Sequence, residues 1–142
     1  MHLLRKATTM KHTVLGFGCL LLMGLFLQGC GSVESNVEKL FETNACEKCD
    51  LSGADLTNRG LLYKTNLKEA NLTGANLKYV NLNNSDLTGA NLKEADLTGA
   101  NLEETVFLGA KNFNTADTTG ARFCKTIMPD GSTKSGGRGC DM

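Results

Sequence analysis

The sequence predicts an all-β solenoid, and two observations in the segment 65–104 carry this prediction. A five-residue phrase recurs there, as in Ala-Asn-Leu-Thr-Gly, with a leucine at the centre of each copy. In an α-helix a five-residue step moves each leucine by about 140° around the axis, so the leucines could not share a face. The Asn and Asp residues before the leucines, and the glycines after some of them, favour turns over helix interiors. The chain is therefore expected to be extended and repeatedly bent.

The interior of the solenoid follows from the extended backbone. Residues two apart share a face, so each leucine points the same way as the small residue two positions before it. One such unit cannot bury its inner face alone and must stack on others. The predicted core residues are Leu67, Leu72, Leu77, Leu82, Leu87, Leu92, Leu97, Leu102 and Phe107, with Thr65, Ala70, Ala75, Val80, Ser85, Ala90, Ala95 and Ala100 beside them.

The Ala-(Asp/Asn)-Leu-x-x phrase resembles that of the pentapeptide repeat proteins, over residues 50–124. The resemblance implies a right-handed quadrilateral β-helix, with one repeat per side and four repeats per coil. Residues twenty apart would then stack, for example Leu67, Leu87 and Phe107. Stacked asparagines would form polar ladders along the corners, Asn71 with Asn91 and Asn81 with Asn101.

Residues 1–29 are predicted to be a lipoprotein-type signal peptide. Three basic residues precede an apolar run, residues 13–27, which is too short for a comfortable membrane span. The run ends in Leu-Gln-Gly-Cys, which resembles a bacterial lipobox and implies that the Cys30 thiol carries a diacylglycerol. The alternatives are cleavage by an ordinary signal peptidase, or an uncleaved anchor, with Cys30 incidental.

The lipobox also predicts where the protein is located. Gly31 follows Cys30 at the place where an Asp would resemble the inner-membrane retention signal. We therefore expect an outer membrane lipoprotein facing the periplasm or the cell surface, and otherwise a periplasmic or secreted protein. The expected partners are the lipid bilayer, through Cys30, and an envelope protein, with no nucleic acid or small-molecule substrate.

Charge and composition argue against catalysis. The whole chain has 15 basic and 15 acidic residues, and the signal segment holds three of the basic ones and none of the acidic ones. Its removal leaves 12 basic residues against 15 acidic ones, a net charge of −3. Both histidines, His2 and His12, also lie in that segment. Without histidine the usual activation of a Ser or Cys nucleophile is missing, so no catalytic residue, cofactor or metal is predicted.

Residues 30–49 are expected to hold the lipidated cysteine, a short tether and a capping helix. Ser35 and Glu38 have the spacing of a capping box, and the apolar residues that follow recur at helical spacing. This predicts a helix over residues 35–43 that covers the open end of the solenoid, with partner binding as the alternative.

Cys46 and Cys49 follow the predicted helix as a CxxC motif. In an exported protein this pair is expected to be a structural disulfide or two packed thiols. A redox role is disfavoured because no helix amino terminus follows to lower a thiol pKa.

An extra residue interrupts the first repeats of the segment 50–123. Leu56 and Leu67 are eleven residues apart, where two repeats need ten. The insertion is expected to make a bulge near Arg59. Arg59 and Tyr63 are the candidate binding residues there, and a tolerated insertion without function is the alternative.

The outward positions of the repeats predict a solvated surface. Charged and neutral residues alternate along each side, without a ladder of like charges or of threonines. This argues against a DNA-like acidic face. Glu103 and Glu104 form the one adjacent acidic pair of the repeats, but no further acidic residue is placed to complete a calcium site or a glycosidase pair.

Residues 124–142 are predicted to close the far end. The stretch from Cys124 reads as a strand, Pro129-Asp130-Gly131 as a turn and the residues after it as a returning strand. In the four-sided coil, Cys49 and Cys124 would be about 17 Å apart, whereas a disulfide needs Cα atoms within about 7 Å. The disulfides are therefore expected to join Cys46 to Cys49 and Cys124 to Cys140.

The preferred function is a non-enzymatic envelope lipoprotein whose rigid rod serves as a scaffold or a protein-binding module. The resemblance also allows a DNA-mimicking protein that interacts with gyrase. Residues 50–124 have 7 basic and 9 acidic residues, a net charge of −2, which is weak for such a mimic. A carbohydrate-binding or carbohydrate-active β-helix is the second alternative.

Overall fold

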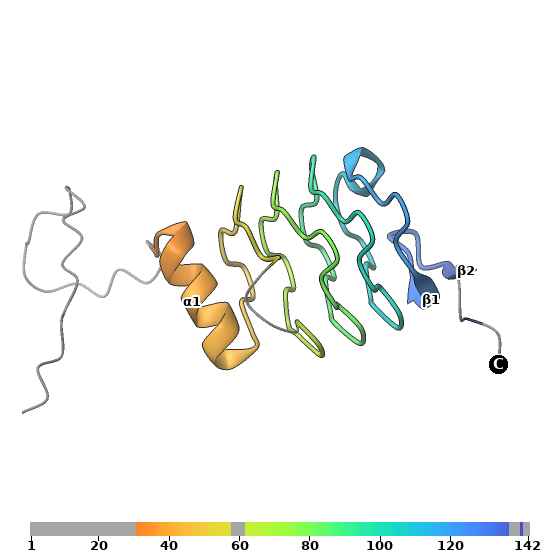
Figure 1. The fold of residues 1–142 in the computed structure, drawn as a ribbon, viewed down its shortest axis with the longest axis horizontal. Coiled ribbons are helices and arrows are strands. Elements are labelled where there is room, and N and C mark those ends of the chain that lie inside the picture. Colours follow the sequence, from red (N-terminus) through yellow and green to blue (C-terminus); the bar gives the residue numbers. More distant parts are fainter. Residues whose placement is uncertain (1–30, 58–61, 137–139, 141–142) are drawn as a thin grey trace, which may run out of the picture.

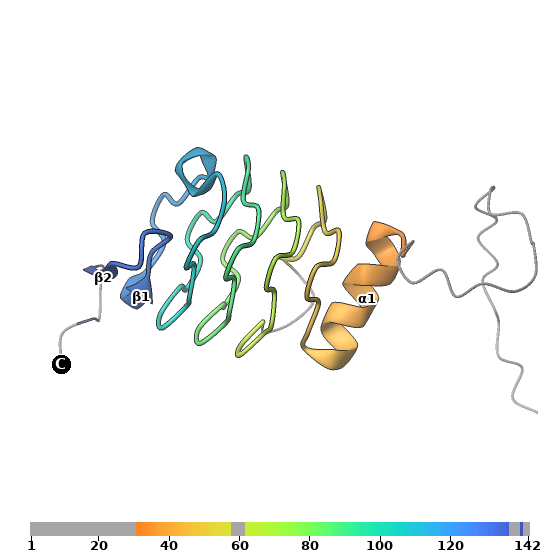
Figure 2. The same ribbon diagram turned by 180° about the vertical axis from the view of Figure 1, so that it is seen from behind.

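The computed structural model describes residues 31–57, 62–136 and 140. A helix lies at one end of the molecule, a stack of coils follows, and a short hairpin lies at the other end (Figure 1). The same order is seen from behind (Figure 2). We call the helical end proximal and the hairpin end distal. The elements are α1 (Val33–Thr43), the 3-10 turn η1 (Phe113–Thr115), β1 (Phe123–Ile127) and β2 (Thr133–Gly136).

The coils are held together by parallel backbone bridges that recur at a fixed step. Asn66 pairs with Asp86, and Asp86 pairs with Val106, twenty residues further on each time. The Leu67 N–H donates to the Asp86 carbonyl at 2.8 Å, and the Asp86 N–H donates back to the Thr65 carbonyl at 2.9 Å. Each coil therefore contains four five-residue units, one per side. We name the sides by their leucines: side A has Leu67 and Leu87, side B has Leu72 and Leu92, side C has Leu77 and Leu97, and side D has Leu82 and Leu102.

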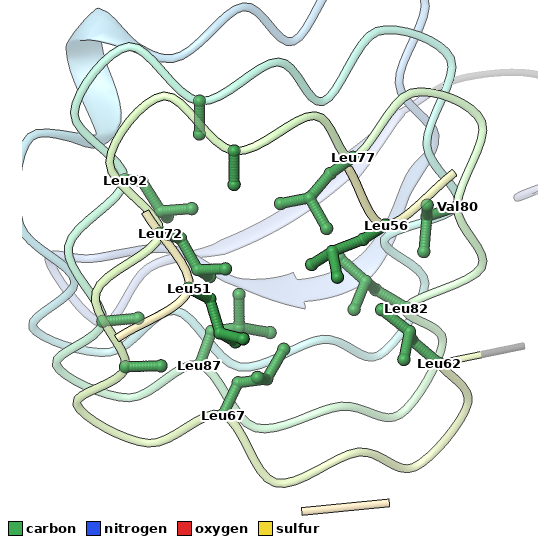
Figure 3. Packing of buried hydrophobic residues seen from close by; sticks show 14 of the residues in the cluster. Leu51, Leu56, Leu62, Leu67, Leu72, Leu77, Val80, Leu82, Leu87 and Leu92 are labelled. Carbon is green, nitrogen blue, oxygen red and sulfur yellow. The ribbon is translucent and has the colours of Figure 1, made fainter. Parts of the chain in front are cut away.

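The predicted inner residues form the core. The leucines from Leu67 to Leu102 and Phe107 are completely buried, and the small residues two positions before them are at most 3% exposed. Side chains from the four sides meet in the centre of the coils (Figure 3). Burial of each leucine or phenylalanine contributes about 1.5–3 kcal/mol, so these columns dominate the stability of the rod.

A left-handed residue closes each corner. The second residue after each repeat leucine from Leu67 to Leu102 has φ between 54° and 69°, and the next N–H can then donate back to the leucine carbonyl, as from Ala70 to Leu67 at 3.1 Å. Glycine adopts this conformation without steric cost. Glu69, Tyr79 and Glu104 adopt it too, so side chains occupy corners that favour glycine.

The step between coils lengthens by one residue at both ends of the stack. Ala45 pairs with Asn66, and Asp96 pairs with Asp117, each at 21 residues. The first extra residue was expected near Arg59, which lies outside the described residues. The second is accommodated in η1, where the chain makes a tight turn on side B before the five-residue units resume.

The proximal cap differs from the predicted helix in its start. The helix begins at Val33, and the Ser32 hydroxyl oxygen accepts a hydrogen bond from the Ser35 N–H at 3.2 Å. Ser32 has the extended backbone of a capping residue, which places Ser35 inside the first turn rather than at the cap. Val37 and Leu40 are buried against the first coil, so the helix covers this end of the core.

The distal cap is a two-stranded antiparallel hairpin. β1 continues the last coil through the bridge between Val106 and Ile127, and β2 folds back on β1. The two disulfides are Cys46–Cys49 and Cys124–Cys140, the expected pairs, with Cα separations of 5.3 Å and 5.4 Å. Each end of the rod therefore has one covalent link close to its cap.

Candidate functional site

The stacked asparagines of side B bind one another. The Asn71 side-chain amide donates to Asp50 at 3.0 Å, that of Asn91 donates to Thr73 at 2.9 Å, and that of Asn112 donates to Asn91 at 2.7 Å. On side D, Asn101 donates to Asn81 at 3.2 Å. The predicted ladder residues Asn71, Asn91, Asn81 and Asn101 lie at the bridging positions within each side, not at the corners where they were expected. Their polar groups are used within the rod.

Ion pairs link successive coils on sides A and C. Lys68 reaches Asp86 at 3.1 Å, and Lys78 reaches Asp96 at 2.9 Å. Hydrogen bonds from Thr98, together with Lys78, hold the pKa of Asp96 below its ordinary value. Exposed pairs of this kind contribute little to stability, but they neutralise the charges of Asp86 and Asp96.

Glu103 and Glu104 each lie beside a cation of the next coil. Glu103 is 3.2 Å from Arg122, and Glu104 is 3.7 Å from Lys125. Among the residues that the structure describes, no three His, Cys, Asp or Glu side chains are grouped as metal ligands. The arrangement of the two glutamates is that of a charged outer surface.

Of the two candidate binding residues near the insertion, only Tyr63 can be placed, because Arg59 lies outside the described residues. Tyr63 is 40% exposed, and the Lys64 amine lies 5.0 Å from the centre of its ring. The Tyr63 carbonyl accepts a hydrogen bond from the Asn44 side chain at 2.8 Å. This contact ties the corner after the insertion to the end of the capping helix.

The cysteines of the CxxC motif are closed in a disulfide and packed in the core. Cys46 is completely buried and Cys49 is 7% exposed. Cys46 occupies the position of a leucine under Leu67, because its N–H donates to the Asn66 carbonyl at 2.7 Å. The Cys46–Cys49 disulfide is therefore part of the packed core of the first coil. Cys30 lies outside the described residues.

The distal end differs from the rest of the surface because apolar residues replace polar ones. Val106 and Ile127 stand on side A where Asn66 and Asp86 stand in earlier coils. Leu108, the first residue after Phe107, is 47% exposed. The sequence carries a signal for this difference, because Val and Ile replace Asn or Asp at two bridging positions.

A groove of about 630 Å³ lies next to these residues. Its apolar lining residues are Ala110, Phe113, Met128 and Pro129, and Lys134 is among its polar lining residues. Phe113 contacts the buried Phe107 edge to face, with ring centres 5.0 Å apart. The groove is therefore lined in part by apolar residues that pack against the hydrophobic core at the distal end. Its position depends on where the hairpin folds back, which the repeat pattern does not specify.

Among the described residues, no helix combines the length and the apolar character needed to cross a membrane. The repeated five-residue units define a coiled repeat protein. The model of the family "Pentapeptide repeats" matches residues 65–103 and 85–128 with 8 copies. This match and the similarity to the solved protein alr5209, described next, support the pentapeptide repeat family for this chain.

Solved pentapeptide repeat proteins are similar to this chain. One is alr5209 from Nostoc Pcc 7120, which is 28% identical, with a TM-score of 0.59 and coverage of 65% of this chain and 76% of that chain. HetL from the cyanobacterium Nostoc sp. strain PCC 7120, described as involved in heterocyst differentiation regulation, is 32% identical, with a TM-score of 0.37 and coverage of 63% and 43%. QnrB1, a plasmid-mediated fluoroquinolone resistance protein, is 20% identical, with a TM-score of 0.33 and coverage of 59% and 43%. A search of curated proteins found no match.

Proposed function

We propose that this pentapeptide repeat protein is a non-enzymatic envelope lipoprotein whose rod is a scaffold and protein-binding module. The observation that carries the proposal is the contrast between the two kinds of outer surface. The polar groups of sides B and D bind one another, whereas the distal end exposes Leu108 and an apolar groove. Exposed apolar surface next to a rigid, polar body is typical of a protein interaction site.

The proposed localisation at the membrane rests on the Leu-Gln-Gly-Cys sequence that ends at Cys30. Lipidation of Cys30 would attach the chain to the membrane just before α1, at the proximal end of the rod. The distal groove would then point away from the lipid, toward other envelope proteins. We further propose a right-handed coil, as the family resemblance implies.

Gyrase interaction remains the alternative for a cytoplasmic, uncleaved chain. It is disfavoured by the neutralised charges on sides A and C, where lysines pair with Asp86 and Asp96. A carbohydrate-active β-helix is disfavoured by the pairing of Glu103 and Glu104 with cations. Turnover of a polysaccharide by the purified protein, lost in Glu103→Gln, would favour that alternative.

The proposed lipidation and localisation are tested by labelling growing cells with a radioactive fatty acid. The wild-type chain should incorporate the label and fractionate with the outer membrane, and Cys30→Ser should do neither. Equal labelling of the two chains would contradict the lipoprotein assignment. A Cys46→Ser, Cys49→Ser double variant is the matched control, because it removes thiols without touching the lipobox.

The binding module is tested with a photo-reactive amino acid placed at single positions. At Leu108 it should give a discrete adduct with an envelope protein in living cells. At Thr73, within the self-paired ladder of side B, it should give none. Adducts from Thr73 but not from Leu108 would contradict the assignment of the distal end as the binding surface.

A further inference from the structure

Among the residues that the structure describes, those after the last coil cover two of the four sides of the distal end. After Asp130 the chain turns back through a hydrogen bond from the Gly131 N–H to the Met128 carbonyl at 2.9 Å. β2 then pairs with β1, which belongs to sides D and A of the last coil. Among the described residues, none stacks on the last units of sides B and C, residues 110–120.

Three backbone groups per unit join successive coils on side C. The Leu97 N–H donates to the Asp117 carbonyl at 2.7 Å, and the Gly99 N–H donates to the Thr119 carbonyl at 2.9 Å. The Ala95 carbonyl accepts from the Asp117 N–H at 2.9 Å. This pattern fixes where a further parallel strand would bind.

The same three groups have no partner in the last unit of side C. They are the N–H groups of Thr118 and Gly120 and the carbonyl of Ala116, and no described residue forms a hydrogen bond with any of them. Gly120 is exposed, and Ala116 and Thr118 are half-buried. An edge of this kind is a template for strand addition, because its donors and acceptors are already in the arrangement of a parallel ladder.

Side B offers a place for an apolar side chain next to this edge. Phe113 and Met128 line the groove beside the last unit of side B. Both are half-buried, so part of their apolar surface faces the groove. A leucine or a similar residue in the added segment would complete the column.

The charge at the edge indicates which polar residue the segment carries. Asp117 accepts a hydrogen bond from the Thr119 N–H at 2.9 Å and forms no ion pair with a described residue. At the same position on side B, Asn71 stacks on Asp50 and donates to its carboxylate at 3.0 Å. A donor side chain, Asn, Lys or Arg, is therefore complementary to Asp117.

We propose that sides B and C of the distal end bind an extended segment of a protein partner as a parallel strand on residues 116–120. The segment places an apolar side chain against Phe113 and Met128, and an Asn, Lys or Arg over Asp117. The inference rests on the proposed function as a protein-binding module, and names its site and the chemistry of its partner.

The probe for this site is a peptide that copies residues 70–79, Ala-Asn-Leu-Thr-Gly-Ala-Asn-Leu-Lys-Tyr. These residues occupy sides B and C two coils earlier, with Asn76 at the position that corresponds to Asp117. Binding to the full chain, purified in detergent, is followed by fluorescence anisotropy. Amide hydrogen exchange is measured with and without saturating peptide.

The peptide should slow exchange at Thr118 and Gly120 by at least tenfold, on the order of the protection that one stable hydrogen bond gives. Thr118→Pro should weaken binding by at least tenfold, because it removes a donor that the free protein does not use. Thr119→Ser is the matched control, since it keeps both N–H groups and the hydroxyl that hydrogen-bonds Asp117, and it should bind as the wild type does. Unchanged exchange at both amides, or equal binding to Thr118→Pro, would overturn the proposal.

Sedimentation of the full chain without peptide separates a partner segment from a second copy. A monomer with fast exchange at Thr118 and Gly120 supports the proposal. A dimer in which both amides are protected would overturn it, because the occupant would then be another copy of the chain. If the adduct from Leu108 persists in Thr118→Pro, the binding module stands and only the strand addition fails.

Discussion

The ring of Tyr79 lies over Gly99, its neighbour at the same corner of the next coil. A Cβ atom on Gly99 would stand 2.5 Å from two carbons of the ring, closer than real contacts allow. Tyr79 is 78% exposed, so the ring can move away at the cost of this contact. The corner thus combines two requirements for glycine, a left-handed backbone and space for the ring.

The variants Gly99→Ala and Gly74→Ala separate these two requirements. Gly74 has φ of 63° and no atom within 4 Å of an added Cβ, so its replacement measures the cost of the left-handed conformation. We expect Gly74→Ala to lower the free energy of unfolding by about 1 kcal/mol, and Gly99→Ala to lower it by more. Chemical denaturation measures both values.

The control is the double variant Tyr79→Ala, Gly99→Ala. Without the ring, the cost of Gly99→Ala should fall to that of Gly74→Ala. Equal costs in the presence and absence of Tyr79 would contradict a steric role of the ring.

Glu103 and Glu104 are adjacent, and we expect their replacement by glycine to change the free energy of unfolding in opposite directions. Glu104 has φ of 54°, whereas Glu103 is not among the residues with positive φ. Glu104→Gly should raise the free energy of unfolding by about 1 kcal/mol because it relieves the left-handed strain. Glu103→Gly should lower it by a similar amount, since it adds flexibility and removes the contact with Arg122. Thermal unfolding of the two variants checks the signs, and a stabilising Glu103→Gly would contradict this account of the corner.

The inner residues could be predicted from the sequence because the five-residue period is a local property. Leu67 to Leu102 are buried as a direct consequence of extended backbone and stacking. The capping helix was predicted too, but its start was wrong, since Ser32 and Ser35 are both suitable caps and the local pattern favoured Ser35. The left-handed corners with Glu and Tyr were not foreseen because nothing in their residue type favours that conformation.

The candidate site was only partly foreseeable. Arg59 and Tyr63 were chosen because an insertion marks them, yet the apolar groove lies at the other end of the rod. Its residues, such as Phe113 and Met128, come together because the hairpin turns back after Asp130. The position of this turn determines which sides of the last coil the described hairpin covers. The five-residue repeat pattern does not specify that position.

Asp96 links the stability of the rod to pH. Hydrogen bonds from Thr98 and the contact with Lys78 lower its pKa from the ordinary value of 3.8. A lowered pKa means that the carboxylate stabilises the fold above pH 3.8, and that this contribution is lost as the pH falls through the lower, folded-state pKa. Asp96→Asn should therefore be less stable than the wild type near neutral pH, with a difference that vanishes in acid.

Denaturation of both chains between neutral and strongly acidic pH measures this difference. Lys78→Met is the control, because it removes the ion pair and keeps the hydrogen bonds from Thr98. Most of the pH dependence should remain in Lys78→Met, since the bond to Thr98 is the larger cause. A constant gap between Asp96→Asn and the wild type at all pH values would contradict the assignment.

A column of buried hydroxyls on side A predicts unequal effects of two similar substitutions. Thr105 is completely buried and donates to the Leu82 carbonyl at 2.8 Å. Ser85, one coil earlier, donates to the Leu62 carbonyl at 2.7 Å and also accepts from the Thr65 N–H at 3.1 Å. For the Thr65 N–H this is the one hydrogen bond among the described residues.

Thr105→Val should cost about 1 kcal/mol, because it removes one donor while the Leu82 carbonyl keeps its bond from the Ser85 N–H at 3.0 Å. Ser85→Ala should cost about 2–3 kcal/mol, because it leaves the buried Thr65 N–H without an acceptor. Urea denaturation gives both values, and Ser85→Thr is the matched control that keeps a hydroxyl at this position. A smaller loss of unfolding free energy in Ser85→Ala than in Thr105→Val would contradict this account. It would mean that the Thr65 N–H finds another acceptor when the Ser85 hydroxyl is removed.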